Sequence, residues 1–157
     1  MPYLTDADII CEPAADHPGW LDWALRDTSR FNTAIMGRTL IRKEADNKAR
    51  VRIFPEHRHS NLFEGVHGAM IMALVDVSLF PALYLLSEGH NKAAAFNSVT
   101  IEASTQFIGA ARIGEPLDAV CEVMHQTGRM AFIRGVVEQG GSLVASWTGL
   151  IRKPSRK

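Results

Sequence analysis

Several features are scarce in this sequence, and each absence excludes a class of protein. Among 157 residues there are two cysteines, Cys11 and Cys121, too few and too far apart to indicate a disulfide framework or a zinc cluster. Basic and acidic residues number 17 each, so no net charge draws the chain to nucleic acid or anionic lipid. Internal repeats and low-complexity stretches are also missing. This composition favours a globular domain with a small-molecule or protein partner.

Short motifs for the common cofactor and metal sites are missing too. There is no P-loop, no dinucleotide-binding glycine motif and no Gly-x-Ser-x-Gly sequence. The spacing of His57, His59 and His67 does not match a zinc site, and no cysteine or second carboxylate completes a ligand set. We therefore expect neither a metal nor a cofactor. The first residues do not resemble a signal peptide, and two free thiols suit a reducing compartment, so a cytoplasmic protein is expected.

One long apolar run stands out, from residue 66 to residue 86. A helix that is apolar on all faces is either buried in a protein or spans a membrane. Asp76 at its centre is costly in lipid, Pro81 interrupts it, and the flanking sequence is rich in amphipathic strands that need a packing partner. The run therefore predicts a buried central helix and not a membrane span.

Strand patterns surround this helix. Residues 1–18 predict an irregular arm, and residues 20–30 have apolar side chains near helical spacing, which predicts a short amphipathic helix. Alternating apolar and polar residues, separated by turn signals such as Asp46-Asn47, predict the following strands: 39–44, 49–54, 98–107, 116–124, 130–138 and 142–152.

Together these elements predict an α+β fold in which a curved antiparallel sheet of about five to six strands wraps one long central helix. We expect an N-terminal arm and short helix over residues 1–36, one domain over 37–153, and a short basic tail over 154–157. One helix in one sheet leaves sheet edges uncovered, and oligomerisation is the expected remedy.

Asp76 is the first candidate for chemistry. Its helical neighbours are apolar, and a carboxylate there is unfavourable unless it is paired or hydrogen-bonded. The structural alternative is an ion pair with a buried arginine or a cap on a backbone group. The functional alternative is a general base or nucleophile in a desolvated pocket.

The start of the same helix supplies further candidates. His67 and Gly68 lie where unpaired backbone N–H groups and the positive end of the helix dipole favour anions and developing oxyanions. Gly68 has no Cβ, so a ligand can approach its backbone closely. Asn61 can hydrogen-bond a carbonyl or a water, although an asparagine in a loop equally often stabilises a turn. His67 can equally serve only to brace the loop.

The sequence from Asn61 to Asp76, Asn-Leu-Phe-Glu-Gly-Val-His-Gly-Ala-Met-Ile-Met-Ala-Leu-Val-Asp, resembles the signature of hotdog-fold acyl-CoA thioesterases of the PaaI-like (phenylacetate-pathway) family. That signature has Asn, five residues, His-Gly-Gly, and an Asp eight residues after the first Gly. Further similarity lies in residues 99–101, 113–115, 127–129 and 143–145. The resemblance covers roughly residues 37–153.

The resemblance implies the hotdog fold and hydrolysis of an acyl-CoA thioester. It also implies that Asp76 activates water or attacks the thioester, that the Gly68 N–H polarises the carbonyl, and that Asn61 and Thr100 assist. Arg129, in a turn, is our candidate for contact with coenzyme A, which is part of the substrate. Ala69 replaces the second glycine of His-Gly-Gly, and its methyl group is expected to narrow the pocket mouth.

The resemblance also implies homodimers that often pair into homotetramers. His67 and Asp76 on one straight helix are roughly 13.5 Å apart along the axis and point to opposite faces, so a site shared between two chains is expected. Two alternatives stay open. One is a hotdog enoyl-CoA hydratase or dehydratase, although the His-Phe-Pro style loop of that branch is missing. The other is a non-catalytic acyl-CoA binding module. The acyl group is not specified by the sequence.

Overall fold

The structure is a computed structural model that describes residues 4–87 and 91–154. Two single-turn 3₁₀ segments, Asp6–Asp8 and His57–His59, accompany the helices α1 (Phe31–Ala34), α2 (Gly68–Leu85) and α3 (Asn91–Phe96). The strands are β1 (Ile9–Pro13), β2 (Leu21–Leu25), β3 (Thr39–Ala45), β4 (Lys48–Ile53), β5 (Val99–Phe107), β6 (Leu117–Gln126), β7 (Met130–Gln139) and β8 (Ser142–Arg152).

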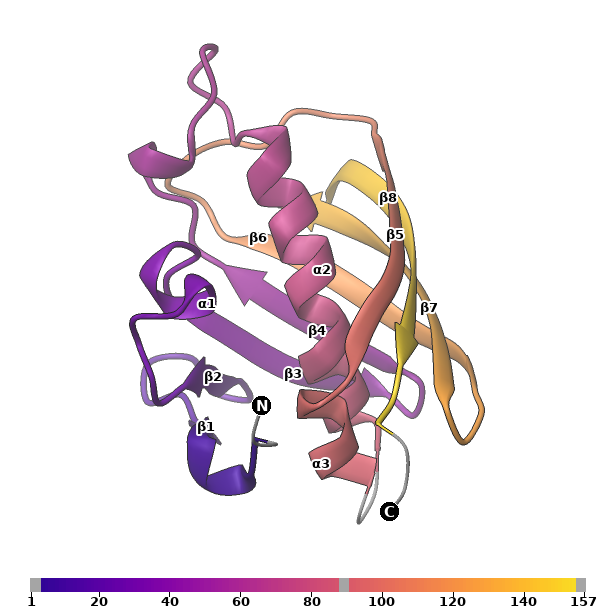
Figure 1. Cartoon of the computed structure of the whole chain (residues 1–157). Coiled ribbons are helices and arrows are strands. Elements are labelled where there is room, and N and C mark those ends of the chain that lie inside the picture. The colour runs from indigo at the N-terminus through magenta and orange to yellow at the C-terminus, as the bar shows by residue number, and fades with distance from the viewer. Residues whose placement is uncertain (1–3, 88–90, 155–157) are drawn as a thin grey trace.

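All the strands join one antiparallel sheet in the order β1-β2-β3-β4-β6-β7-β8-β5. The sheet curves around α2, which crosses its concave face (Figure 1). This confirms the predicted α+β architecture. The sheet has eight strands, where the sequence predicted about five to six, because β1 and β2 extend it at the N-terminal edge.

The N-terminal segment is where the sequence prediction was wrong. Residues 20–30 do not form an amphipathic helix, because β2 pairs with β1 on one side and with β3 on the other. Within β2, Trp23 is buried while Leu21 and Leu25 are half-buried. The spacing of apolar residues in such a short run is compatible with either a helix or a strand. Pairing with β3 favours the strand. The helical turn that does form, α1, comes later in the chain.

Helix α2 has the length and hydropathy of a membrane span, and more than half of it is buried inside the protein. Its buried side chains, including Leu74, Leu79 and Leu83, pack on inward-facing residues of β3, β4, β6, β7 and β8. Burial of this apolar surface is the main source of stability for the helix. The predicted central helix is confirmed as the core of the sheet.

Two glycines allow close packing in the core, one between the sheet and the helix and one within the sheet. A Cβ on Gly149 of β8 would lie 2.6 Å from a methyl carbon of Leu79, so only glycine allows α2 to pack this closely against β8. Gly135 of β7 leaves the space that the Trp147 ring fills, and a Cβ there would overlap that ring. The contact at Gly149 fixes how closely α2 approaches the sheet, and therefore the position of the residues along the helix.

Strand β5 is an edge strand with one free side. A bulge between Thr100 and Glu102 inserts Ile101 as an extra residue opposite β8. The bulge breaks the regular alternation that the sequence predicted over residues 98–107, and most side chains on both faces are exposed. Apolar Val99, Ile101 and Phe107 are each about half exposed along this edge.

Candidate active site

One stripe of α2 is left uncovered by the sheet. Ala69, Met72, Ala73 and Asp76 follow one another at helical spacing, and all four are exposed or half-buried. The 57–59 turn and α1 lie on one side of α2 and β5 lies on the other (Figure 1). Asp76 is therefore the one ionisable side chain in an otherwise apolar stripe that substrate or a partner can reach.

Asp76 has one hydrogen-bond partner in the described part of the chain. The Thr100 hydroxyl of β5 donates a hydrogen bond to Asp76 Oδ1, at 2.7 Å. Both residues are half-buried, and no arginine or lysine is paired with the carboxylate among residues 4–87 and 91–154. The buried ion pair that the sequence left open as a structural role for Asp76 is thus not formed within these residues. The second carboxylate oxygen remains available to a water or a substrate.

The start of α2 presents an unpaired backbone donor. No acceptor for the Gly68 N–H lies among residues 4–87 and 91–154, as is usual for the first turn of a helix. The α position of Gly68 faces the Phe107 ring, since a Cβ there would lie 3.4 Å from two ring carbons. The sequence pattern placed Phe107 in the strand predicted over residues 98–107 and gave no sign of this contact with the start of the helix. The aromatic ring limits the space beside the Gly68 backbone.

His67 is the N-cap of α2. Its ring Nδ1 accepts a hydrogen bond from the Ala69 backbone N–H at 3.0 Å. The backbone N–H of His67 donates to the His59 carbonyl at 2.8 Å. Because Nδ1 is an acceptor, the proton of the neutral ring is on Nε2. The bracing role that the sequence allowed for His67 is therefore present, and the ring is exposed beside Gly68.

Asn61 holds the loop that precedes the helix. Its Oδ1 accepts hydrogen bonds from the N–H groups of Phe63 (2.8 Å) and Gly65 (3.2 Å), which confirms a turn-stabilising role. The Nδ2 donors have no acceptor in the described segments of the chain. Leu62 and Phe63 at the tip of the loop are almost fully exposed.

The predicted residues fall into two groups. Asn61, His67 and Gly68 gather at the start of α2, whereas Asp76 and Thr100 meet roughly 12 Å further along its axis. Strand β5 connects the groups: it contacts Asp76 through its beginning and Gly68 through its end. A single chain does not bring the Gly68 N–H and the Asp76 carboxylate to one small carbonyl.

Arg129 lies in the exposed turn between β6 and β7. No hydrogen bond or ion pair is formed by its side chain with the described residues. The neighbouring Met130 pairs with Arg152, which also pairs with Val99 at the start of β5. The turn is therefore at the end of the sheet where Thr100 meets Asp76.

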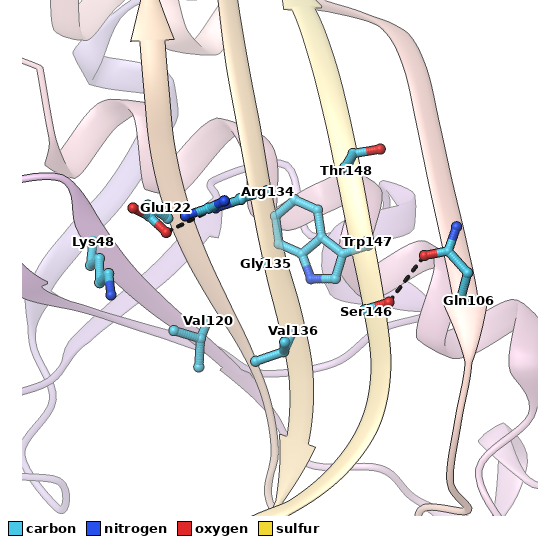
Figure 2. Close-up of a pocket in the computed structure, with 10 residues that line it drawn as sticks. All are labelled: Lys48, Gln106, Val120, Glu122, Arg134, Gly135, Val136, Ser146, Trp147 and Thr148. Atoms are coloured by element: carbon cyan, nitrogen blue, oxygen red, sulfur yellow. Dashed lines mark hydrogen bonds and ion pairs between the residues drawn. The ribbon is translucent and has the colours of Figure 1, made fainter.

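A separate hollow of about 400 Å³ lies on the face of the sheet opposite to α2 (Figure 2). Its polar contacts are an Arg134–Glu122 ion pair at 3.1 Å and a hydrogen bond donated by Ser146 to Gln106 at 3.0 Å. Trp147 forms part of its floor. None of the residues that the sequence singled out for chemistry lines this hollow, so it is not the candidate active site.

The two thiols do not belong to the site. Cys121 is buried under α2, and burial raises the pKa of its thiol to about 12. Burial also raises the pKa of the half-buried Cys11 thiol above its ordinary value. Neither side chain forms an appreciable thiolate at neutral pH, so neither is suited to nucleophilic catalysis.

Comparison with known proteins places the chain in a family. A model described as the thioesterase superfamily matches residues 63–146, which include the start of α2, Asp76 and Thr100. A curated protein of Pseudomonas aeruginosa named as an esterase is 28% identical over 120 residues, covering 76% of this chain and 86% of its own length.

Solved structures share the fold. The PaaI protein from the phenylacetic acid degradation operon of Escherichia coli superposes with a TM-score of 0.65 at 16% identity, covering 80% of this chain and 86% of its own. A thioesterase of Streptococcus pneumoniae, solved with coenzyme A, superposes with a TM-score of 0.62 at 18% identity, covering 76% and 90%. The resemblance to PaaI-like thioesterases and the hotdog fold that it implied are confirmed.

Proposed function

The chain belongs to the thioesterase superfamily, and from this we propose that it hydrolyses an acyl-CoA thioester to the free acid and coenzyme A. The observation that carries the proposal is the Thr100–Asp76 hydrogen bond. A half-buried carboxylate that pairs with no cation in the described part of the chain is held in one orientation by a hydroxyl, at the position of the family's catalytic aspartate. Its second oxygen, which has no hydrogen-bond partner among residues 4–87 and 91–154, is suited to act on a water or a carbonyl.

In the proposed reaction a C–S bond is replaced by a C–O bond. The thioester oxygen accepts a hydrogen bond from the Gly68 N–H, and the helix dipole stabilises the charge that develops on it. Asp76 then either takes a proton from the attacking water or attacks the carbonyl itself, forming an anhydride that water hydrolyses. The thiolate of coenzyme A leaves, and a proton from the medium makes it the free thiol. Asn61 orients the carbonyl or the water through its Nδ2 donors, which have no acceptor within residues 4–87 and 91–154.

A two-fold arrangement brings the two halves of the site together. Gly68 and Asp76 of one chain are roughly 12 Å apart along the helix, too far for one carbonyl to contact both. If two β5 edges pair antiparallel, the start of one strand meets the end of the other. Because β5 contacts Asp76 at its start and Gly68 at its end, this pairing brings Asp76 of one copy toward Gly68 of the other. We therefore propose a homodimer with two composite sites.

The coenzyme A portion of the substrate extends from the site toward the surface. We propose that Arg129 contacts its phosphates, since the guanidinium is exposed, has no partner in residues 4–87 and 91–154, and lies at the Asp76 end of the sheet. This contact supports binding rather than the chemical step.

Hydrolysis of a panel of acyl-CoA substrates, followed by release of the free thiol, tests the proposal directly. Asp76→Asn preserves volume and removes the base or nucleophile, so turnover should fall by about 10²-fold or more. The matched control is Asp46→Asn in the exposed β3–β4 turn, which should retain wild-type turnover. Near-normal hydrolysis by folded Asp76→Asn protein would contradict the mechanism.

The composite site has its own test. Gly68→Val obstructs the carbonyl site and Asp76→Asn removes the carboxylate, so each variant alone should be inactive. Unfolding and refolding the two together produces heterodimers with one intact site and one doubly altered site. Activity should return in proportion to the heterodimers, which differently tagged chains allow to be counted. Heterodimers without activity would show that each site lies within one chain.

A further inference from the structure

A second hollow lies directly beside the candidate site, and no sequence motif pointed to it. It measures about 270 Å³ and lies between α1 and the first two turns of α2. Phe31 of α1 and its C-cap residue Ile35 form one wall, and Met70 and Ala73 of α2 form the other. Resting on the proposed thioesterase function, we propose that this hollow, the α1 pocket, holds the acyl group of the substrate and limits its size.

The α1 pocket is continuous with the place where the carbonyl is expected. An open depression of about 580 Å³ over Asn61 and Gly68 shares Ser60 and His67 with the α1 pocket, so the two hollows meet at these residues. A carbonyl held at the Gly68 N–H therefore has the α1 pocket next to it on the same side of the loop. Ala73, in the wall of the pocket, precedes Asp76 by one turn of α2. The acyl group extends from the reacting carbonyl into this space.

Helix α1 is fixed in place by its backbone, which leaves its side chains free to line the pocket. His59 is 5% exposed, and its Nε2–H donates to the Ile35 carbonyl at 2.7 Å while its Nδ1 accepts from the Glu56 N–H at 2.9 Å. Arg58 donates to the Ala34 carbonyl at 3.3 Å. The polar atoms of His59 are thus already used, and α1 is a stable wall despite its length.

The chemistry of the lining selects an uncharged, apolar acyl group. Phe31 and Ile35 remain 51% and 50% exposed, although both are large apolar side chains that would gain from a cover. Arg58 also lines the pocket, where its guanidinium donates to Glu56 and to the Ala34 carbonyl, both at 3.3 Å, so its charge is already partly paired. A bound hydrocarbon would cover the apolar wall.

The volume sets the size class. The α1 pocket is about twice as large as the roughly 150 Å³ apolar cavity that holds one benzene molecule. It therefore suits a six-membered ring on a short spacer, or an unbranched chain of similar bulk. Ala69, where the family motif has its second glycine, is among the lining residues and adds a methyl group to this space. Long-chain acyl groups exceed this space.

Chain-length profiles test the assignment. With acetyl-, butyryl-, hexanoyl-, decanoyl- and benzoyl-CoA, wild-type kcat/KM should rise by about fourfold per added methylene until the pocket is filled, and then fall. Ala73→Leu should fill the pocket and move the optimum to shorter chains, lowering hexanoyl-CoA hydrolysis at least tenfold while acetyl-CoA hydrolysis changes less than threefold. Ile35→Ala should enlarge the pocket and move the optimum toward decanoyl-CoA.

The control is Phe132→Ala on β7, where an exposed apolar side chain lines a different hollow. This control variant should not lower kcat/KM for any one acyl-CoA substrate relative to the others. An unchanged profile in both pocket variants, with wild-type hydrolysis intact, would overturn the α1 pocket and leave the proposed function standing. If Ile35→Ala instead changes the mass of the assembly and not the profile, α1 contacts another copy and the assignment is wrong. Absence of hydrolysis of every substrate by the wild type would overturn the function and the pocket together.

Discussion

Thr100→Val tests whether the Asp76 carboxylate must be held in a fixed orientation for hydrolysis. The Thr100 hydroxyl donates the hydrogen bond that orients Asp76, at 2.7 Å, and valine has nearly the same shape without the donor. Valine is also a favourable strand residue, so β5 should form normally. The change therefore removes one interaction and very little else.

The expected magnitude follows from the hydrogen bond itself. A hydrogen bond to a charged group contributes about 1.5–3 kcal/mol. Because Asp76 is half-buried, a water molecule can replace the Thr100 donor in the variant, so most of this energy is not lost from folding stability. If the orientation of the carboxylate is required in the transition state, the loss appears in catalysis as a roughly 10- to 150-fold fall in kcat/KM. The free energy of unfolding should change by less than about 1 kcal/mol.

The assay is thiol release from the best acyl-CoA substrate, with thermal denaturation as the check on folding. Thr100→Ser keeps the donor and should retain most of the activity. Placed on Asp76→Asn, Thr100→Val should cost little more, because the two residues act as one unit. A folded Thr100→Val enzyme within twofold of wild type would refute the view that Thr100 positions the catalytic carboxylate.

Three further outcomes are expected. Gly135→Ala should lower the free energy of unfolding by about 2–3 kcal/mol or more, and Tm by about 5–10 °C or more, because its Cβ would overlap both the Val120 carbonyl oxygen and the Trp147 ring. Gly128→Ala in the open β6–β7 turn should be near neutral, and equal Tm values for the two variants would contradict the packing. Arg129→Ala should raise KM for acyl-CoA several-fold with kcat unchanged in steady-state assays, and an unaltered KM would remove it from the coenzyme A contacts. Cys121 should react with a thiol reagent only on unfolding, since burial raises its pKa to about 12, and rapid modification of the native protein would contradict its burial.

The sequence predicted the elements whose local pattern and tertiary environment agree. The long apolar run became α2, and alternating runs separated by turn signals became β3, β4 and β5 to β8. The N-terminal prediction failed for a physical reason: β2 is five residues long, and a run that short fits two periods equally well until a neighbouring strand pairs with it. The short helix α3 was missed, although its alanines were a visible signal.

For the candidate site, the sequence supplied the residues but not their grouping. Spacing along one helix was enough to show that Gly68 and Asp76 are far apart. The contact of Asp76 with Thr100 depends on the path of β5, 24 residues later, and the role of Phe107 depends on the far end of the same strand. The α1 pocket joins α1, the 57–59 turn and α2, three segments that no motif connects.

Strand β5 links assembly to activity. An open edge with half-exposed Val99, Ile101 and Phe107 favours pairing with another chain, and the same strand spans the distance between Gly68 and Asp76. One antiparallel pairing along β5 would therefore cover the edge and complete both sites, so an isolated chain should be folded around α2 yet inactive. Specific activity should fall on dilution at the same concentration at which analytical ultracentrifugation detects dissociation. A charged substitution in the strand, Ile101→Glu, should raise the protein concentration at which half of the activity is lost. It should raise the concentration for half-dissociation by the same factor. Full activity in a monomer would mean that one chain brings its carbonyl donor and its carboxylate together by another route.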